Sequence, residues 1–229
     1  MICIAKKHWM WTLPTSTRAR PQELVTNFLR LTRCKVRRIF CDNEFPNAKE
    51  FEKWANSNGI NLCPSAGYNH LLHARAEGAQ RINKEHVRAA MKRANAPLQC
   101  WPFATKHFCR QYNHWPDKEG TTGWDYMPDT DLHPDYRKDN IPWGCYVTGH
   151  LPREHREVAD TTNDDRALEG AFMGWHDTTP TVWIYSFKHQ RVLRLCDPSF
   201  RPHLFPFANP TCLVNKQFLT DQHIQDLHS

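Results

Sequence analysis

The chain has 229 residues, of which 40% are hydrophobic and 24% are charged, and its formal net charge at pH 7 is +6. This composition is typical of a globular protein and excludes an intrinsically disordered chain. No apolar run approaches the roughly twenty residues that cross a membrane, and no secretory leader is expected, so we predict an intracellular protein with no membrane partner. The nine cysteines include no pair separated by two residues, which favours free thiols over disulfides or a zinc knuckle.

The N-terminal half of the chain alternates between predicted strands and helices. Residues 1–14 show the alternation of an extended segment, and a polar turn follows. Pro21 begins a helix whose apolar residues recur at helical spacing. Residues 36–41 form a short predicted strand, residues 47–58 a second helix that ends before Gly59, and residues 60–63 another strand.

The rest of the chain divides into a helical part and a β-rich part. Residues 70–95 predict one long helix that Pro97 closes, and residues 101–112 a further helix. Residues 114–140 lack periodicity and are rich in Asp, Pro and Thr, which indicates a linker. Residues 141–200 hold short strand-like pieces that predict a small β module, with predicted strands at 144–147, 170–175, 182–185 and 192–195. The predicted domains are therefore 1–113, a linker at 114–140, a β module at 141–200 and a tail at 201–229.

Asp42 directly follows the predicted strand 36–41. Ligands bind at the carboxyl ends of strands in open α/β sheets, so an acid at this position is a candidate ligand for a metal ion. Asp42-Asn43 is also ordinary turn chemistry after a strand, and this phrase alone does not decide between the two.

Glu77 lies on the long predicted helix, 35 positions after Asp42. On a helical wheel it shares one face with a basic ridge formed by Arg81, Lys84, Arg88 and Lys92. An apolar face lies beside this ridge and is expected to pack against a sheet. The alternative is a solvated helix face in which Glu77 pairs with Arg81 one turn away.

These residue types fit phosphodiester transfer on DNA. Two divalent metal ions can activate the attacking oxygen and stabilise the leaving oxygen, and Mg²⁺ prefers carboxylate ligands that converge from separate elements. A run of cations beside the acids would hold the phosphate backbone.

In order along the chain, several phrases resemble the integrases of copia-type retrotransposons. In the first half these are Asp42-Asn43-Glu44-Phe45, Gly59-Ile60, Ser65 and Glu77. In the second half, Trp143-Gly144-Cys145 resembles the family's Phe-Gly-Cys phrase, and Gly170-Ala171-Phe172-Met173-Gly174-Trp175 resembles its Gly-x-Phe-Leu-Gly-Tyr phrase. The resemblance covers roughly residues 5–200.

The resemblance implies an α/β, RNase H-like mixed sheet flanked by helices, with a truncated or degenerate first strand, followed by the small β-rich module. It implies Mg²⁺ (or Mn²⁺) held by three carboxylates, of which Asp42 would be the second and Glu77 the third. The implied reaction is 3′-end processing followed by strand transfer, and the implied partners are element ends, target DNA and further copies of the chain. Nuclear localisation is implied as well.

The chain departs from the family pattern at the first carboxylate. No Asp or Glu precedes Glu23, and Ala5 stands where the first catalytic Asp is expected. The gap between Asp42 and Glu77 is one residue shorter than usual, and His73-Ala74 and Gly78 replace family residues around Glu77. We therefore expect a degenerate integrase, and the sequence leaves open whether it still catalyses or is a non-catalytic, DNA-binding remnant or domesticated module.

A structural metal site is the third hypothesis. His70, His73 and His86 lie on the long helix and could bind zinc together with a nearby cysteine. Because no compact Cys/His quartet occurs, surface histidines are the favoured interpretation.

Overall fold

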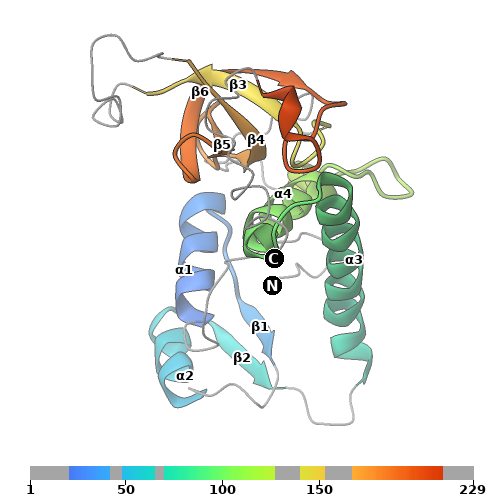
Figure 1. Cartoon of the computed structure of the whole chain (residues 1–229). Helices are drawn as coiled ribbons and strands as arrows, with labels where there is room; N and C mark the ends of the chain where they lie inside the picture. Colours follow the sequence, from blue (N-terminus) through green and yellow to red (C-terminus); the bar gives the residue numbers. More distant parts are fainter. Residues whose placement is uncertain (1–20, 42–47, 65–69, 127–139, 153–166, 214–229) are drawn as a thin grey trace. The chain divides into compact units, whose positions relative to one another are not determined.

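The computed structural model describes residues 21–41, 48–64, 70–126, 140–152 and 167–213. Helix α1 (Pro21–Thr32), strand β1 (Arg38–Cys41), helix α2 (Ala48–Ser57) and strand β2 (Asn61–Pro64) come first (Figure 1). They are followed by helices α3 (His70–Ala94) and α4 (Trp101–Asn113) and by strands β3 (Tyr146–His150), β4 (Ala167–Trp175), β5 (Val182–Ser186) and β6 (Arg191–Arg201). Short 3-10 turns cover Leu98–Cys100, Trp124–Tyr126 and Pro210–Cys212. The protein is thus mixed α/β.

The chain forms two compact units that are not contiguous in sequence. The first unit takes in the residues up to Asn83 and those from Cys109 to Pro134, and the barrel unit takes in Lys84–Phe108 and the residues from Asp135 onward. The division falls inside α3 and inside α4, so each of these helices contributes to both units.

In the first unit, α1 and α2 pack beside a short parallel sheet. Pro21 opens α1 in the position where proline suits a helix, and Phe28 is fully buried. One cluster joins Val25 of α1 to Phe51 and Ala55 of α2 and to Ile60. Gly59 ends α2 with a φ of +66°, a backbone conformation that glycine adopts without strain.

Strands β1 and β2 pair in parallel, with Ile39 opposite Leu62 and Cys41 opposite Pro64. Side chains alternate along β1, so that Ile39 packs into the cluster while Phe40 is half exposed on the other face. The carboxyl ends of both strands therefore lie at the same edge.

Helix α3 ends in a Schellman arrangement. The N–H of Asn95 donates to the carbonyl of Lys92, and the N–H of Ala96 donates to that of Met91. Asn95 has a φ of +52°, as the residue after such a helix commonly does, and Pro97 follows. The C-terminal boundary of α3 is therefore fixed by its local sequence.

Strands β3 to β6 form an antiparallel sheet that closes on itself through the pairing of β3 with β6 (Figure 1). Its interior is apolar and includes Val147, Phe172, Val182, Ile184 and Leu195, all fully buried. Register shifts occur between Thr148 and His150 and between Phe172 and Gly174. Such irregularities bend strands, as closing a small sheet requires.

Parts of α3 and α4 pack against this barrel. A Cβ on Gly144 would lie 2.5 Å from the Cβ of Ala94, so the end of α3 meets the barrel without room for a methyl group. His107 of α4 makes an edge contact with Phe172 at 5.3 Å, and Arg93 lies over the ring of Phe205. Trp143, which is 1% exposed, donates from Nε1 to the carbonyl of Met173.

The helices and strands predicted within the described ranges are confirmed. Their boundaries differ by up to three residues except in β6, which ends at Arg201, six residues beyond the predicted strand 192–195. The extended segment expected at residues 1–14, with Ala5, and the acid Asp42 lie outside the described residues. The four-stranded closure of the β module was not predicted from the strand-like pieces. None of the described helices has the length and apolarity needed to cross a membrane.

Candidate nucleic-acid interface

The candidate interface is the basic ridge on α3, formed by Arg81, Lys84, Arg88 and Lys92. All four side chains are exposed, as is Glu77 at the start of the same face. At about 100° per residue the five positions fall within an arc of about 80°. The structure therefore places the predicted residues on one solvent-facing side of a single helix.

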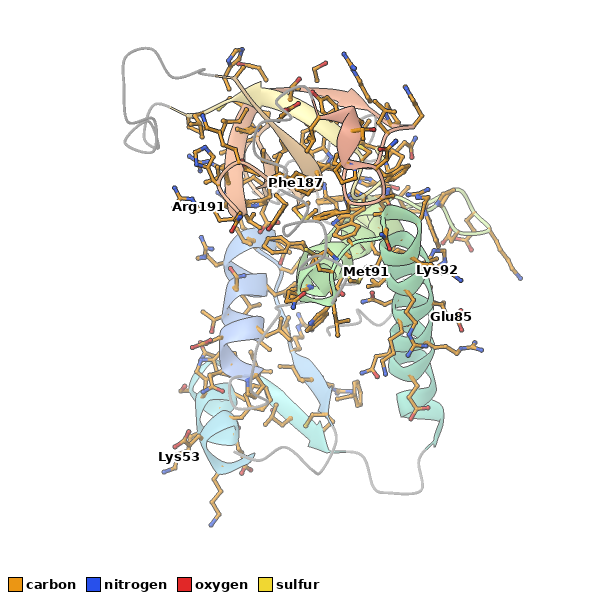
Figure 2. All side chains as sticks on the ribbon, in the orientation of Figure 1. Lys53, Glu85, Met91, Lys92, Phe187 and Arg191 are labelled. Atoms are coloured by element: carbon orange, nitrogen blue, oxygen red, sulfur yellow. The ribbon has the colours of Figure 1, made fainter. Side chains whose placement is uncertain are left out.

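The side of α3 opposite the basic ridge is buried, so the ridge faces solvent. Ala79, Asn83, Val87 and Ala94 are each less than 9% exposed, and they recur at helical spacing. Figure 2 shows Lys92 and Met91 on different sides of the helix. Burial of the apolar face thus holds the cations toward solvent.

The ridge is positively charged over a length that suits a polyanion. From Arg81 to Lys92 a helix rises about 16 Å, which corresponds to roughly five base-pair steps of a DNA strand. Glu77 and Glu85, both exposed, are the acids nearest to it in sequence. None of the four cations is paired with a carboxylate in the part of the chain that the structure describes. A phosphate backbone can therefore approach them.

The predicted carboxylate set is only partly described. Glu77 lies exposed on α3, and β1 ends at Cys41, immediately before Asp42, which lies outside the described residues. One exposed carboxylate does not build a magnesium site. Among the described residues, no group of three or more His, Cys, Asp or Glu side chains could hold a metal ion. Glu77 alone cannot support a metal-dependent step.

Of the three histidines in the structural-zinc hypothesis, only His86 has a described side chain. The ring of His86 stacks on Phe108 at 4.6 Å, within the barrel unit. The side chains of His70 and His73 are outside the described set, although their backbone is helical. Among what is described, His86 has an aromatic contact rather than a ligand set.

A second polar cluster was not singled out from the sequence. It lies on the barrel and joins His176, Trp183 and Arg194 with the ion pair of Lys106 and Asp177. Every residue of Val182-Trp183-Ile184-Tyr185 is apolar or aromatic, so the sequence did not distinguish the two faces of β5, whereas the burial in the structure alternates along it. The contribution of Lys106 from a distant helix carried no signal.

Comparison with known proteins finds no matching family model and no significant match among curated proteins. The likeness to copia-type integrases thus depends on the ordered sequence phrases alone. The geometry of α3 is independent of that likeness, because it follows from burial and helical spacing.

Proposed function

We propose that this chain is an integrase-like, DNA-binding protein of retrotransposon origin in which metal-dependent end processing and strand transfer are impaired. The observation that carries DNA binding is the row of four exposed cations on α3, opposite a buried face. Such a row binds duplex DNA through its phosphates and without base readout. The proposed partners are element ends and target DNA, and the proposed place of action is the nucleus.

Two features of the sequence support integrase ancestry and impaired catalysis. The phrases from Asp42 to Trp175 occur in the family's order, and Ala5 stands at the position of the first acid. With that acid missing, at least one of two Mg²⁺ (or Mn²⁺) sites would lack a ligand. The RNase H-like topology and assembly into a homo-oligomer belong to this proposal.

Duplex binding is tested by charge reversal on the ridge. A plot of log K for duplex binding against the logarithm of the salt concentration has a slope of about −0.9 for each phosphate contact on B-DNA. Reversing Arg81, Lys84 and Arg88 should therefore reduce the magnitude of this slope by about 3. Fluorescence anisotropy of a labelled duplex over a salt series measures this slope.

The matched control reverses three exposed lysines outside α3, namely Lys35 and, on α2, Lys49 and Lys53 (Figure 2 labels Lys53). This control should leave the slope nearly unchanged. Equal losses in both variants would indicate a general effect of net charge, and unchanged binding in the ridge variant would exclude the ridge as the interface.

An active polynucleotidyl transferase is the second candidate, and Asp42 and Glu77 favour it. Labelled DNA ends are incubated with the protein and Mg²⁺ or Mn²⁺, with Glu77→Gln as the control. We expect no product from the natural chain. Cleavage that Glu77→Gln abolishes would establish an active enzyme, and cleavage only after Ala5→Asp would identify the missing ligand.

A further inference from the structure

An aromatic ring is held among cations on the outer face of the barrel. Along β5, Val182 and Ile184 are fully buried, so Trp183 between them lies on the opposite face, where it is half-buried. The ring of His176 lies 5.7 Å from the indole ring, inclined by 39°. Two aromatic rings thus share this part of the surface.

Three segments bring charge to the same place. Arg194 of β6 is the register partner of Trp183 across the antiparallel pair. Lys106 of α4 binds Asp177, next to His176, with Nζ 2.7 Å from Oδ2. We call His176, Trp183, Arg194, Lys106 and Asp177 the Trp183 patch. Its two fixed cations exceed its single anion.

The ring of His176 is oriented by its own turn. The N–H of Thr178 donates to Nδ1 over 3.4 Å, and the hydroxyl of Thr179 lies 3.0 Å from the same atom. That hydroxyl is held in turn by Thr181 at 2.7 Å. These contacts hold the His176 ring in its place beside Trp183.

We propose that the Trp183 patch binds a nucleotide of single-stranded nucleic acid, with the base against Trp183 and the phosphate on Arg194. Base stacking on an aromatic ring combined with a nearby cation is the usual chemistry of single-strand recognition. An acidic peptide would use the cations but would leave the ring without a matching group. The patch shares no residue with the α3 ridge, so this inference does not depend on the proposed duplex binding.

The test uses the full chain and a labelled oligothymidylate of about ten nucleotides, a length within the usual range for one small β domain. Trp183→Leu should weaken its binding by about 5- to 140-fold, the range for loss of one base stack, whereas Trp183→Phe should retain most of the affinity. Arg194→Gln should also weaken binding.

The matched control for charge is Arg191→Gln, on the same strand as Arg194 but opposite Ser186 (Figure 2 labels Arg191). It removes the same charge at a distance from the ring and should change the affinity little. The matched control for the aromatic ring is Trp115→Leu, because Trp115 is exposed but belongs to the first unit. If Trp183→Leu fails to fold, Trp183→Phe and the two arginine variants still decide the outcome.

Several results would overturn the inference. Unchanged affinity in a folded Trp183→Leu variant would remove the ring from the interface. Equal losses in Arg191→Gln and Arg194→Gln, or competition by polyphosphate as effective as by the oligonucleotide, would reduce the patch to a general anion surface. Tighter binding of polyglutamate would indicate a protein partner instead.

Failure here is distinguishable from failure of the proposed function. Reversal of Arg81, Lys84 and Arg88 should weaken duplex binding and leave the contribution of Trp183 to oligothymidylate binding intact. A chain that binds duplex but no oligothymidylate would contradict this inference alone, and the reverse result would contradict only the ridge.

Discussion

Gly144 has a φ of +80° and lies against the end of α3. A methyl group there would lie 2.5 Å from the Cβ of Ala94 and would also force a side chain into the left-handed region. We predict that Gly144→Ala lowers the free energy of unfolding of the barrel unit by about 2–4 kcal/mol, combining backbone strain with overpacking. Urea unfolding of the full chain, followed by hydrogen exchange of β3 to β6, measures this loss.

Gly59→Ala is the control for that substitution. Gly59 has a similar φ of +66°, but nothing lies within 4 Å of the Cβ position. Gly59→Ala should therefore lower the free energy of unfolding of the first unit by the backbone strain alone, about 1 kcal/mol. If Gly144→Ala costs no more than Gly59→Ala, the close approach of Ala94 is not a real constraint.

His176 links the stability of the barrel unit to pH. Burial lowers the pKa of His176, Arg194 and Lys106 lower it further, and Asp177 opposes them. The folded state therefore binds fewer protons than the unfolded state once the pH falls below the ordinary value of about 6.5. The stability that the neutral His176 side chain contributes is fully present above pH 6.5. It is lost as the pH falls from 6.5 toward the lowered pKa of the folded state.

We predict that the barrel unit loses stability between pH 7.5 and 5.5, and that His176→Gln reduces this loss. Urea midpoints at several pH values measure how stability changes with pH in the natural chain and in His176→Gln. His150→Gln is the matched control, because it removes an exposed imidazole at the end of β3 in the same unit. An identical slope in the natural chain and in His176→Gln would remove His176 as a source of the pH dependence.

At the scale of elements, apolar periodicity predicted the helices and strands because each must bury one side. Phe51 and Ala55 are buried on α2 as their spacing indicated, and Trp143 and Trp175 pack the barrel. The pairing of β3 with β6, which closes the barrel, could not be predicted, because register depends on contacts between strands about fifty residues apart.

The α3 ridge could be predicted from the sequence, whereas the Trp183 patch could not. The α3 ridge was predictable because its residues share one helix, and a helix fixes their spacing without any tertiary contact. The Trp183 patch needs β5, β6 and α4 to meet, and neither Arg194 nor Lys106 forms a local pattern with Trp183. The apolar run of residues 182–185 gave no indication of which face is exposed.

Trp124 shows that composition alone does not reveal packing. It lies within the segment predicted to be a linker, yet it is 8% exposed, packs with Phe28 and Leu31 of α1 and stacks on His114 at 5.1 Å. We predict that Trp124→Ala destabilises the first unit by about 3–5 kcal/mol, as is typical for a buried tryptophan. Hydrogen exchange of the α1 amides measures the effect.

Trp115→Ala in the same segment is the control, because Trp115 is 46% exposed and its ring lies at a tilt to that of Tyr112. Its cost should stay below about 1 kcal/mol. If both substitutions cost the same, the contact of Trp124 with α1 contributes little to the first unit.

At the scale of the whole molecule, the two units share α3 and α4 rather than following one another along the chain. Residues up to Asn83 and from Cys109 belong to the first unit, and Lys84–Phe108 belong to the barrel unit. A helix that serves two packing units can lose its hydrogen bonds in two stages, because each part depends on a different core. The α3 ridge crosses this division between Arg81 and Lys84.

Hydrogen exchange of paired variants tests this division. We predict that Gly144→Ala lowers the protection of β3 to β6 and of the amides 87–94 and 101–108 together, by about 30- to 700-fold for a loss of 2–4 kcal/mol. The amides of α1 should keep their protection in that variant. Trp124→Ala should do the reverse, lowering protection in α1 and in residues 109–113 while the barrel keeps its own. Uniform loss of protection along α3 and α4 in both variants would mean that the helices open as single elements, and the ridge would then form or melt as one surface.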